Sequence, residues 1–139
     1  MIILDTNVVS EPLRPQPDPS VLNWLDAHDP ATFYLTTISV AELMAGVEAM
    51  PPGRRREGLE QALSRQVTAL FEGRILNFDA KAAEAFANVA SGAQAQGNPI
   101  GFADCAIAAI ARARGFAVAT RNVRDFRGAG VEIIDPWAV

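Results

Sequence analysis

Residues 1–7 read Met-Ile-Ile-Leu-Asp-Thr-Asn, and this stretch decides the fold. The run Ile2–Leu4 is apolar without alternating polar residues, which is typical of a strand buried on both faces. Asp5 follows directly. It could close the strand through a turn onto Asn7, but an acid placed straight after a buried strand favours a functional role. The stretch therefore predicts a central strand of a covered sheet with a carboxylate at its end.

Further strands and helices alternate along the rest of the chain. Apolar β-type runs predict strands at 33–36, 75–78, 116–119 and 131–134, and periodic apolar residues predict helices at 19–28, 39–50, 54–72, 80–96 and 102–114. Asp18, Ser39 and Asp79 are expected as helix N-caps, and Gly115 as a left-handed C-cap. This order predicts an α/β fold with a five-stranded parallel sheet flanked by helices, in one domain covering residues 1–139.

Composition excludes several classes of protein. The chain has 139 residues, one Cys and one His, so neither a disulfide within the chain nor a usual Cys/His zinc site is expected. No basic leader or 18-residue apolar run occurs, which predicts a cytoplasmic chain without a membrane span. The net charge of −4 argues against coating nucleic acid by bulk charge. Eight of the 12 basic residues nevertheless fall in Arg54–Arg56 and between Arg112 and Arg127, which permits a local basic groove.

Acidic residues converge at one edge of the predicted sheet. Asp5, Glu42 and Asp125 follow strand ends, where open α/β sheets keep their sites, and Asp104 joins them if its helix faces the same edge. Clustered carboxylates repel unless a cation neutralises them, and oxygen-only ligands select hard divalent ions such as Mg²⁺. Such a site activates water and stabilises charge on a phosphodiester, so we expect magnesium-assisted phosphodiester hydrolysis.

Each of these acids also has an ordinary structural explanation. Glu42 lies three residues after Ser39 and completes the pattern of a capping box. Asp104 could simply favour the positive end of its helix, although its neighbours are small and apolar. Asp125 could pair on the surface with Arg121 or Arg124. These alternatives remain open at the level of spacing.

Four motifs resemble PIN-domain proteins in order and spacing. They are the N-terminal stretch 1–7, Thr-Ile-Ser-Val-Ala-Glu-Leu at 37–43, Ala-Asp-Cys-Ala-Ile-Ala-Ala at 103–109 and Ala-Thr-Arg-Asn-Val-Arg-Asp-Phe at 119–126. The similarity is strongest to the VapC and FitB group of bacterial toxins, helped by Ser-Glu-Pro-Leu-Arg at 10–14 and Asp-Pro-Trp at 135–137. It spans essentially the whole chain.

The resemblance implies a three-layer PIN-like fold and a toxin of a type II toxin–antitoxin pair. It further implies an endoribonuclease that uses Mg²⁺, with Mn²⁺ as the alternative, and a homodimer with a cognate antitoxin that alone contacts DNA. Asp5, Glu42 and Asp104 match the first three family acids. The polar positions expected around them, which orient ligands, waters and substrate, are Thr6, Asn7, Ser39, Thr120, Arg121 and Asn122.

The fourth acidic position departs from a single family pattern. Some relatives carry the acid directly after Thr-Arg, where this chain has Asn122, and others carry it at the position of Asp125. We expect Asp125 to fill it, because an amide cannot act as a base near neutral pH.

Three rival functions remain. A haloacid-dehalogenase-type phosphatase would need an acid where Asn7 stands, and a receiver module would need a lysine on its last strand, whereas the only lysine is Lys81. The third rival is a PIN scaffold that only binds nucleic acid or a partner protein, without cleaving RNA.

Overall fold

The computed structural model describes residues 1–139, and its centre is a parallel sheet of five strands. The strands are β1 (Ile2–Leu4), β2 (Phe33–Thr36), β3 (Ile75–Leu76), β4 (Ala117–Ala119) and β5 (Ile133–Ile134), in the order β3-β2-β1-β4-β5. β1 pairs with β2 on one side and with β4 on the other. The predicted α/β fold with a five-stranded parallel sheet is confirmed.

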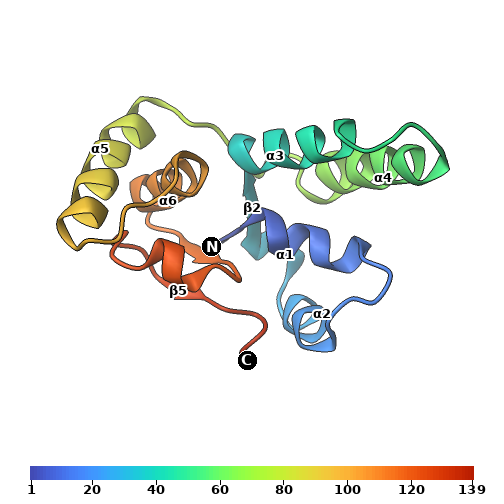
Figure 1. Cartoon of the computed structure of the whole chain (residues 1–139). Coiled ribbons are helices and arrows are strands. Elements are labelled where there is room, and N and C mark those ends of the chain that lie inside the picture. Colours follow the sequence, from blue (N-terminus) through green and yellow to red (C-terminus); the bar gives the residue numbers. More distant parts are fainter.

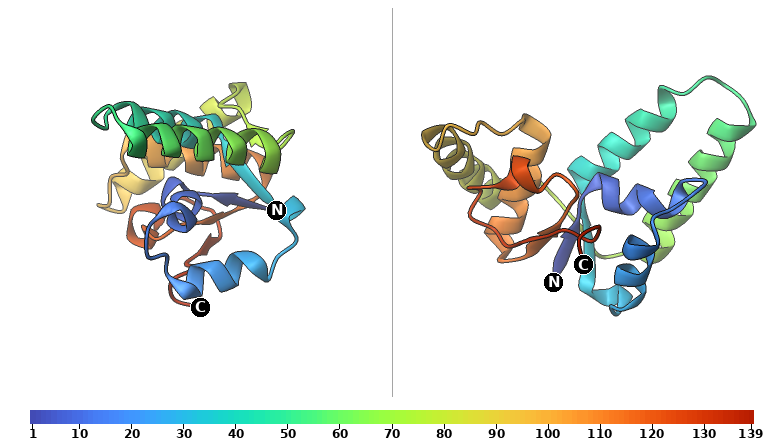
Figure 2. Two further views of the ribbon diagram at one scale, coloured as in Figure 1. Left: turned by 90° about the vertical axis from the view of Figure 1, so that its right-hand side faces the viewer. Right: turned by 60° about the horizontal axis from the view of Figure 1, so that its bottom comes forward.

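Helices cover both faces of this sheet. They are α1 (Thr6–Ser10), α2 (Pro19–Asp26), α3 (Thr37–Glu48), α4 (Arg54–Arg65), α5 (Ala80–Ala95) and α6 (Phe102–Arg114), with the short turns η1 (Glu11–Leu13), η2 (Pro30–Thr32), η3 (Gln66–Leu70) and η4 (Val123–Phe126). Figures 1 and 2 show α5 and α6 on one side of the sheet, and α1 to α4 on the other. The antiparallel pair α3 and α4 extends away from the sheet (Figure 2, right).

Alternation along β1 explains the three layers. Ile2 and Leu4 join the core beneath α1 to α4, whereas Ile3 joins the core beneath α5 and α6. β4 repeats the pattern, with Val118 in the second core and its two neighbours in the first. Because both faces of the strand are covered, every side chain of β1 is buried, as an uninterrupted apolar run predicts.

Two of the predicted N-caps and the predicted C-cap are confirmed. Asp18 accepts a hydrogen bond from the Ser20 N–H (2.8 Å) at the start of α2, and Asp79 accepts one from the Ala82 N–H (3.0 Å) at the start of α5. Gly115 ends α6 with a φ of 72°, in the left-handed region that a side chain disfavours.

The third N-cap prediction is wrong. α3 begins at Thr37, its N-cap is Thr36, and the Thr36 hydroxyl accepts a hydrogen bond from the Ser39 N–H (3.1 Å). β2 runs into α3 without a loop, so the last strand residue caps the helix and Ser39 lies inside its first turn. Thr36, Thr37 and Ser39 all carry a hydroxyl, and Thr36 is the cap because the helix begins immediately after the strand.

Several element bounds are also shorter than predicted. The helix from Arg54 stops at Arg65 and continues as the π-helical turn η3, and α2 stops at Asp26. β3 and β5 keep only two residues each, because strands at the sheet edges have one neighbour to pair with. None of the helices has the length and apolar character needed to cross a membrane.

Candidate active site

Asp5 occupies the centre of the candidate site, at the end of the middle strand. It is 2% exposed, and it caps α1 by accepting a hydrogen bond from the Thr6 N–H (2.8 Å). Its other oxygen accepts from the Thr120 hydroxyl (2.7 Å) and from the Asn7 amide (3.4 Å). Burial raises the pKa of Asp5, the hydrogen bonds lower it, and the charge of Glu42 raises it further, with a net upward shift.

Glu42 reaches the same site from α3. Its Oε1 accepts a 2.8 Å hydrogen bond from the Thr6 hydroxyl, although the two residues are far apart in sequence. The capping-box interpretation of Glu42 is wrong, since Thr36 is the N-cap and the Glu42 side chain contacts α1 instead of the start of its own helix. Thr6 therefore links the first two acids, because its N–H donates a hydrogen bond to Asp5 and its hydroxyl donates one to Glu42.

Asp104 brings the four acids into one electrostatic cluster. It lies in the first turn of α6, half-buried. Burial raises its pKa from the ordinary 3.8 to about 6, with smaller contributions from the negative charges of Asp5, Asp125 and Glu42. The helix that carries Asp104 thus faces the edge of the sheet at which the other three acids lie.

Asp125 lies in η4, exposed and close enough to raise the pKa of Asp104. The ion pairs of the structure join Arg14 to Glu11 and Arg56 to Glu48 and Glu60. Asp125 therefore pairs with neither of its neighbouring arginines, which removes the surface-pair explanation of this residue.

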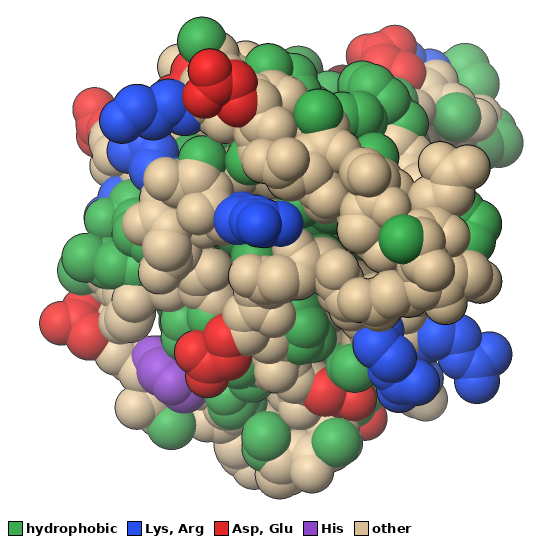
Figure 3. Space-filling view, turned by 90° about the vertical axis from the view of Figure 1, so that its left-hand side faces the viewer, with side chains coloured by type: hydrophobic (Ala, Val, Ile, Leu, Met, Phe, Trp, Pro, Cys, Tyr) green, Lys and Arg blue, Asp and Glu red, His purple; other side chains and the backbone are tan.

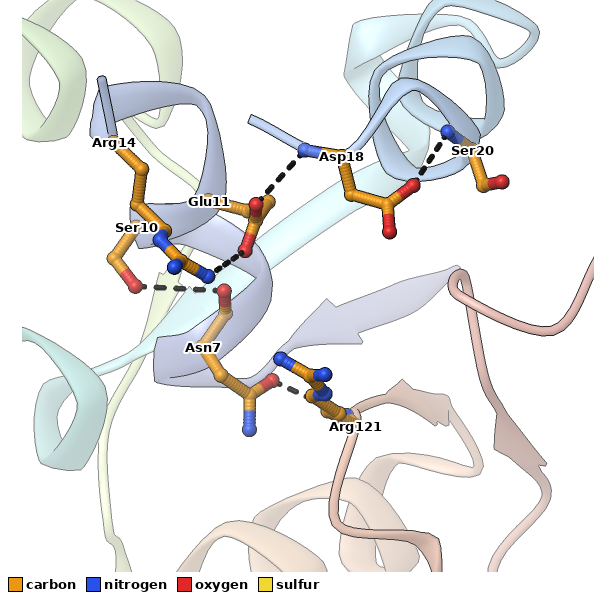
Figure 4. A network of polar contacts seen from close by, with 7 residues as sticks. All are labelled: Asn7, Ser10, Glu11, Arg14, Asp18, Ser20 and Arg121. Carbon is orange, nitrogen blue, oxygen red and sulfur yellow. Dashed lines mark hydrogen bonds and ion pairs between the residues drawn. The ribbon is translucent and has the colours of Figure 1, made fainter. Parts of the chain in front are cut away.

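The predicted polar residues divide into two groups. Thr6, Asn7, Thr120, Arg121 and Asn122 surround Asp5: the Arg121 N–H donates to Asn7 Oδ1 (3.2 Å), and the Asn122 N–H donates to the Thr120 hydroxyl (3.0 Å). Figure 4 shows the Asn7 side chain pointing from α1 toward Arg121. Ser39 is different. It is fully buried and its polar contacts are with Thr36, so it stabilises the start of α3.

The acids fit a hard divalent cation by their chemistry. No Lys or Arg pairs with any of the four, so their mutual repulsion is uncompensated. No three His, Cys, Asp or Glu side chains are arranged to hold one ion directly. Mg²⁺ typically takes one or two carboxylates directly and keeps several waters, so this arrangement is compatible with it.

A groove of about 730 Å³ runs from the site between α1, α3 and α4. Thr6 and Glu42 line its inner end, Arg14 and Arg55 supply positive charge, and the remainder is mainly apolar. Arg14 was not among the predicted site residues, although it ends the Ser-Glu-Pro-Leu-Arg stretch at 10–14. Its position depends on buried Glu11, which accepts a hydrogen bond from the Asp18 N–H (2.9 Å) and pairs with Arg14 (3.2 Å), as Figure 4 shows. The sequence feature that could have indicated this arrangement is the acid Glu11, which precedes the prolines Pro12, Pro15 and Pro17.

One face of the molecule carries charges of both signs. On the face shown in Figure 3, basic and acidic side chains are both scattered, and neither forms a patch across it. Contact with an anionic polymer at this face would therefore have to come from individual arginines, as the net charge of −4 already indicated.

Comparison with known proteins identifies relatives along the whole chain. The family model described as PIN domain matches residues 2–131. The chain is 47% identical to VapC ribonuclease Y4jK of Sinorhizobium fredii over 99% of this chain and 98% of that protein. It is 44% identical to Toxin FitB of Neisseria gonorrhoeae over 99% of both. The solved structure of FitAB bound to IR36 DNA has a chain that matches with a TM-score of 0.95 and 42% identity, covering 100% of this chain and 97% of that one.

Proposed function

We propose, because the chain belongs to the PIN-domain family, that it is the toxin of a type II toxin–antitoxin pair and a metal-dependent endoribonuclease. The observation that carries the proposal is the convergence of four carboxylates from separate elements, where Asp104 carries a pKa near 6. Relatives of similar length are a ribonuclease and a toxin by name. Cleavage of RNA phosphodiester bonds is the reaction that fits both.

Asp5, Glu42, Asp104 and Asp125 would hold the metal, one or two of them directly and the others through its waters. We propose that the metal is Mg²⁺, with Mn²⁺ as a substitute. When bound, the ion would polarise a water and offset the charge that builds on the phosphate. Asp5 is oriented for this role by Thr6 and Thr120, and Glu42 by the Thr6 hydroxyl. Asp125, free of an ion pair, would accept a proton from the attacking water as the fourth acid.

The substrate would be held by arginines beside this acidic centre. Arg121 follows Thr120 directly and is exposed, and its N–H donates to Asn7. A guanidinium at this position can bind a backbone phosphate through paired N–H donors. Binding would then position the scissile bond against the carboxylates without any bulk positive charge on the protein.

A cognate antitoxin would occupy the groove that leads to the site. The groove is largely apolar, with Glu42 at its inner end, so it suits an amphipathic segment that carries an arginine. FitB was solved within FitAB bound to DNA, which supports a pair in which the antitoxin contacts DNA. We also propose that the toxin is a homodimer.

Cleavage of RNA by the purified chain tests the enzymatic proposal. We expect cutting with added Mg²⁺ or Mn²⁺, loss of cutting with EDTA, and a loss of at least 100-fold in Asp5→Asn and Asp104→Asn. Glu84→Gln is the matched control, because it removes an exposed acid on α5 outside the site. Equal rates in Asp5→Asn and wild type would assign the activity to a contaminant, and the PIN scaffold that only binds would become the better explanation.

Growth tests the toxin assignment. Induction of the chain alone in bacteria should slow growth, and co-expression of its antitoxin should restore it. Asp104→Asn should be harmless at the same level of soluble protein. Normal growth with abundant wild-type protein would contradict the assignment.

A further inference from the structure

The guanidinium of Arg121 is held by an aromatic ring and not by an acid. Its central carbon lies 5.2 Å from the ring centroid of Trp137. Arg121 forms no ion pair, although Asp5, Asp104 and Asp125 all lie at the same edge of the sheet. The side chain thus keeps its full positive charge beside an acidic centre.

The main chain of Arg121 is tied to that centre. Its N–H donates to Asn7 Oδ1 (3.2 Å), and the Asn7 amide donates to Asp5 Oδ2 (3.4 Å). Figure 4 shows Arg121 beside Asn7 at the start of α1. Both ends of the residue are therefore anchored, the backbone on Asn7 and the guanidinium on Trp137.

Trp137 is held in place through its main chain and its packing. Its backbone N–H donates to Asp135 Oδ1 (2.9 Å), the intervening Pro136 is fully buried, and the side chain packs against the core beneath α1 to α4. The segment after β5 is joined to Thr120 through β5, because the Thr120 N–H donates to the Ile134 carbonyl (2.9 Å). The aromatic ring thus keeps a constant position relative to the acids.

We propose that Trp137 is a positioning residue that presents Arg121 to the backbone phosphate of an RNA strand at the acidic centre. The inference rests on the proposed ribonuclease function. A ring attracts the face of a guanidinium and leaves the N–H donors at its edges available, whereas a carboxylate would occupy those donors. The same arrangement keeps Arg121 from neutralising the carboxylates that the metal requires.

Kinetics of substitutions at both residues test the proposal. Trp137→Leu should raise KM for an RNA oligonucleotide about threefold to fivefold with kcat near wild type, a range typical of losing an exposed cation–π contact. Trp137→Phe should restore most of the affinity. Arg121→Lys keeps the charge and removes the planar stacking group, so it should raise KM similarly. In Arg121→Ala, the added Trp137→Leu should cause no further loss, since the interaction is already absent.

A binding measurement separates this proposal from the ribonuclease proposal. Trp24 is the only other tryptophan, so Trp24→Phe leaves Trp137 as the sole fluorescent indole. Adding the oligonucleotide in EDTA should change this fluorescence, and Trp137→Leu should weaken binding of the labelled oligonucleotide to the same extent as it raises KM.

If wild type binds RNA without cutting it, the ribonuclease proposal fails while weaker binding by Trp137→Leu still supports the positioning role. Affinity and KM equal to wild type in both Trp137→Leu and Arg121→Lys would overturn that role, and so would wild-type protein that binds no RNA. Arg121→Lys is a surface change and keeps the test decisive if Trp137→Leu does not fold.

Discussion

The Thr120 hydroxyl donates a 2.7 Å hydrogen bond to Oδ2 of Asp5, joining the end of β4 to the end of β1. The bond is buried and favours the charged form of Asp5, against the burial that raises its pKa. Thr120 also accepts a hydrogen bond from the Asn122 N–H, so one hydroxyl connects the central carboxylate to the loop that carries Asp125.

Removing this hydroxyl should shift the pH profile. Thr120→Val raises the pKa of Asp5 further, so the acid limb of the kcat profile should move to higher pH and the rate at neutral pH should fall about tenfold. Thr120→Ser retains the donor and should leave the limb in place. A profile for Thr120→Val that overlays wild type would show that the hydrogen bond has no influence on catalysis.

Asp104 should make the protein less stable at neutral pH than in mild acid. Its folded pKa of about 6 exceeds the ordinary 3.8, so its contribution to stability is fully present below 3.8 and is lost as pH rises through 6. Asp104→Asn should therefore raise Tm by a few degrees at pH 7.5 and less at pH 4.5, measured by thermal unfolding in EDTA. Added Mg²⁺ should reduce the difference in Tm between Asp104→Asn and wild type, because it binds and stabilises the wild-type protein. A gain in Tm that is the same at both pH values would contradict the raised pKa.

The fourth acidic position can be assigned by two substitutions. Asp125→Asn should lower kcat by at least tenfold because it removes a base, whereas Asn122→Ala should cost less than threefold. The RNA cleavage assay at saturating metal measures both. The reverse order of losses would assign the position to Asn122.

Substitution by alanine should change the stability of the protein in opposite directions at two glycines, one inside a helix and one at a helix end. Gly58 lies inside α4 with open space where a Cβ would be, so Gly58→Ala should stabilise the protein by about 0.5–1 kcal/mol. Gly115 has a φ of 72°, so Gly115→Ala should cost about 1–2 kcal/mol. Denaturant unfolding measures both, and cleavage per folded molecule should stay unchanged. A stable Gly115→Ala variant would place the end of α6 in another conformation.

Patterns that act within a few residues predicted most of the fold. An apolar run marks a buried strand and an aspartate before a helix marks its cap, which is why β1, α2 and α5 begin where the sequence indicates. The Ser39 prediction was wrong because it left residues 37–38 between the strand and the helix, whereas α3 follows β2 directly and is capped by Thr36, three residues earlier. Residue spacing alone does not show that a strand continues into a helix without a loop.

The sequence predicted which residues form the candidate site, but not the hydrogen bonds between them. Asp5 and Glu42 were predicted because each follows the end of a strand, whereas the hydrogen bonds by which Thr6 links them depend on how α3 packs on α1. Trp137 carried no chemical signal of its own, because an aromatic residue near a terminus is usually a core residue. Only the return of the chain beside β4 brings its ring to Arg121.

The strand order determines when during synthesis the active site can form. β1 is the first strand to leave the ribosome and the middle strand of the sheet, and one of its two neighbours, β4, begins at Ala117. Asp5 and Glu42 emerge before the segment 43–103, and Asp104, Thr120 and Asp125 emerge after it. Until β4 has been made, β1 lacks one of its two neighbours and Asp5 lacks the hydrogen bond from Thr120, so the four acids cannot come together.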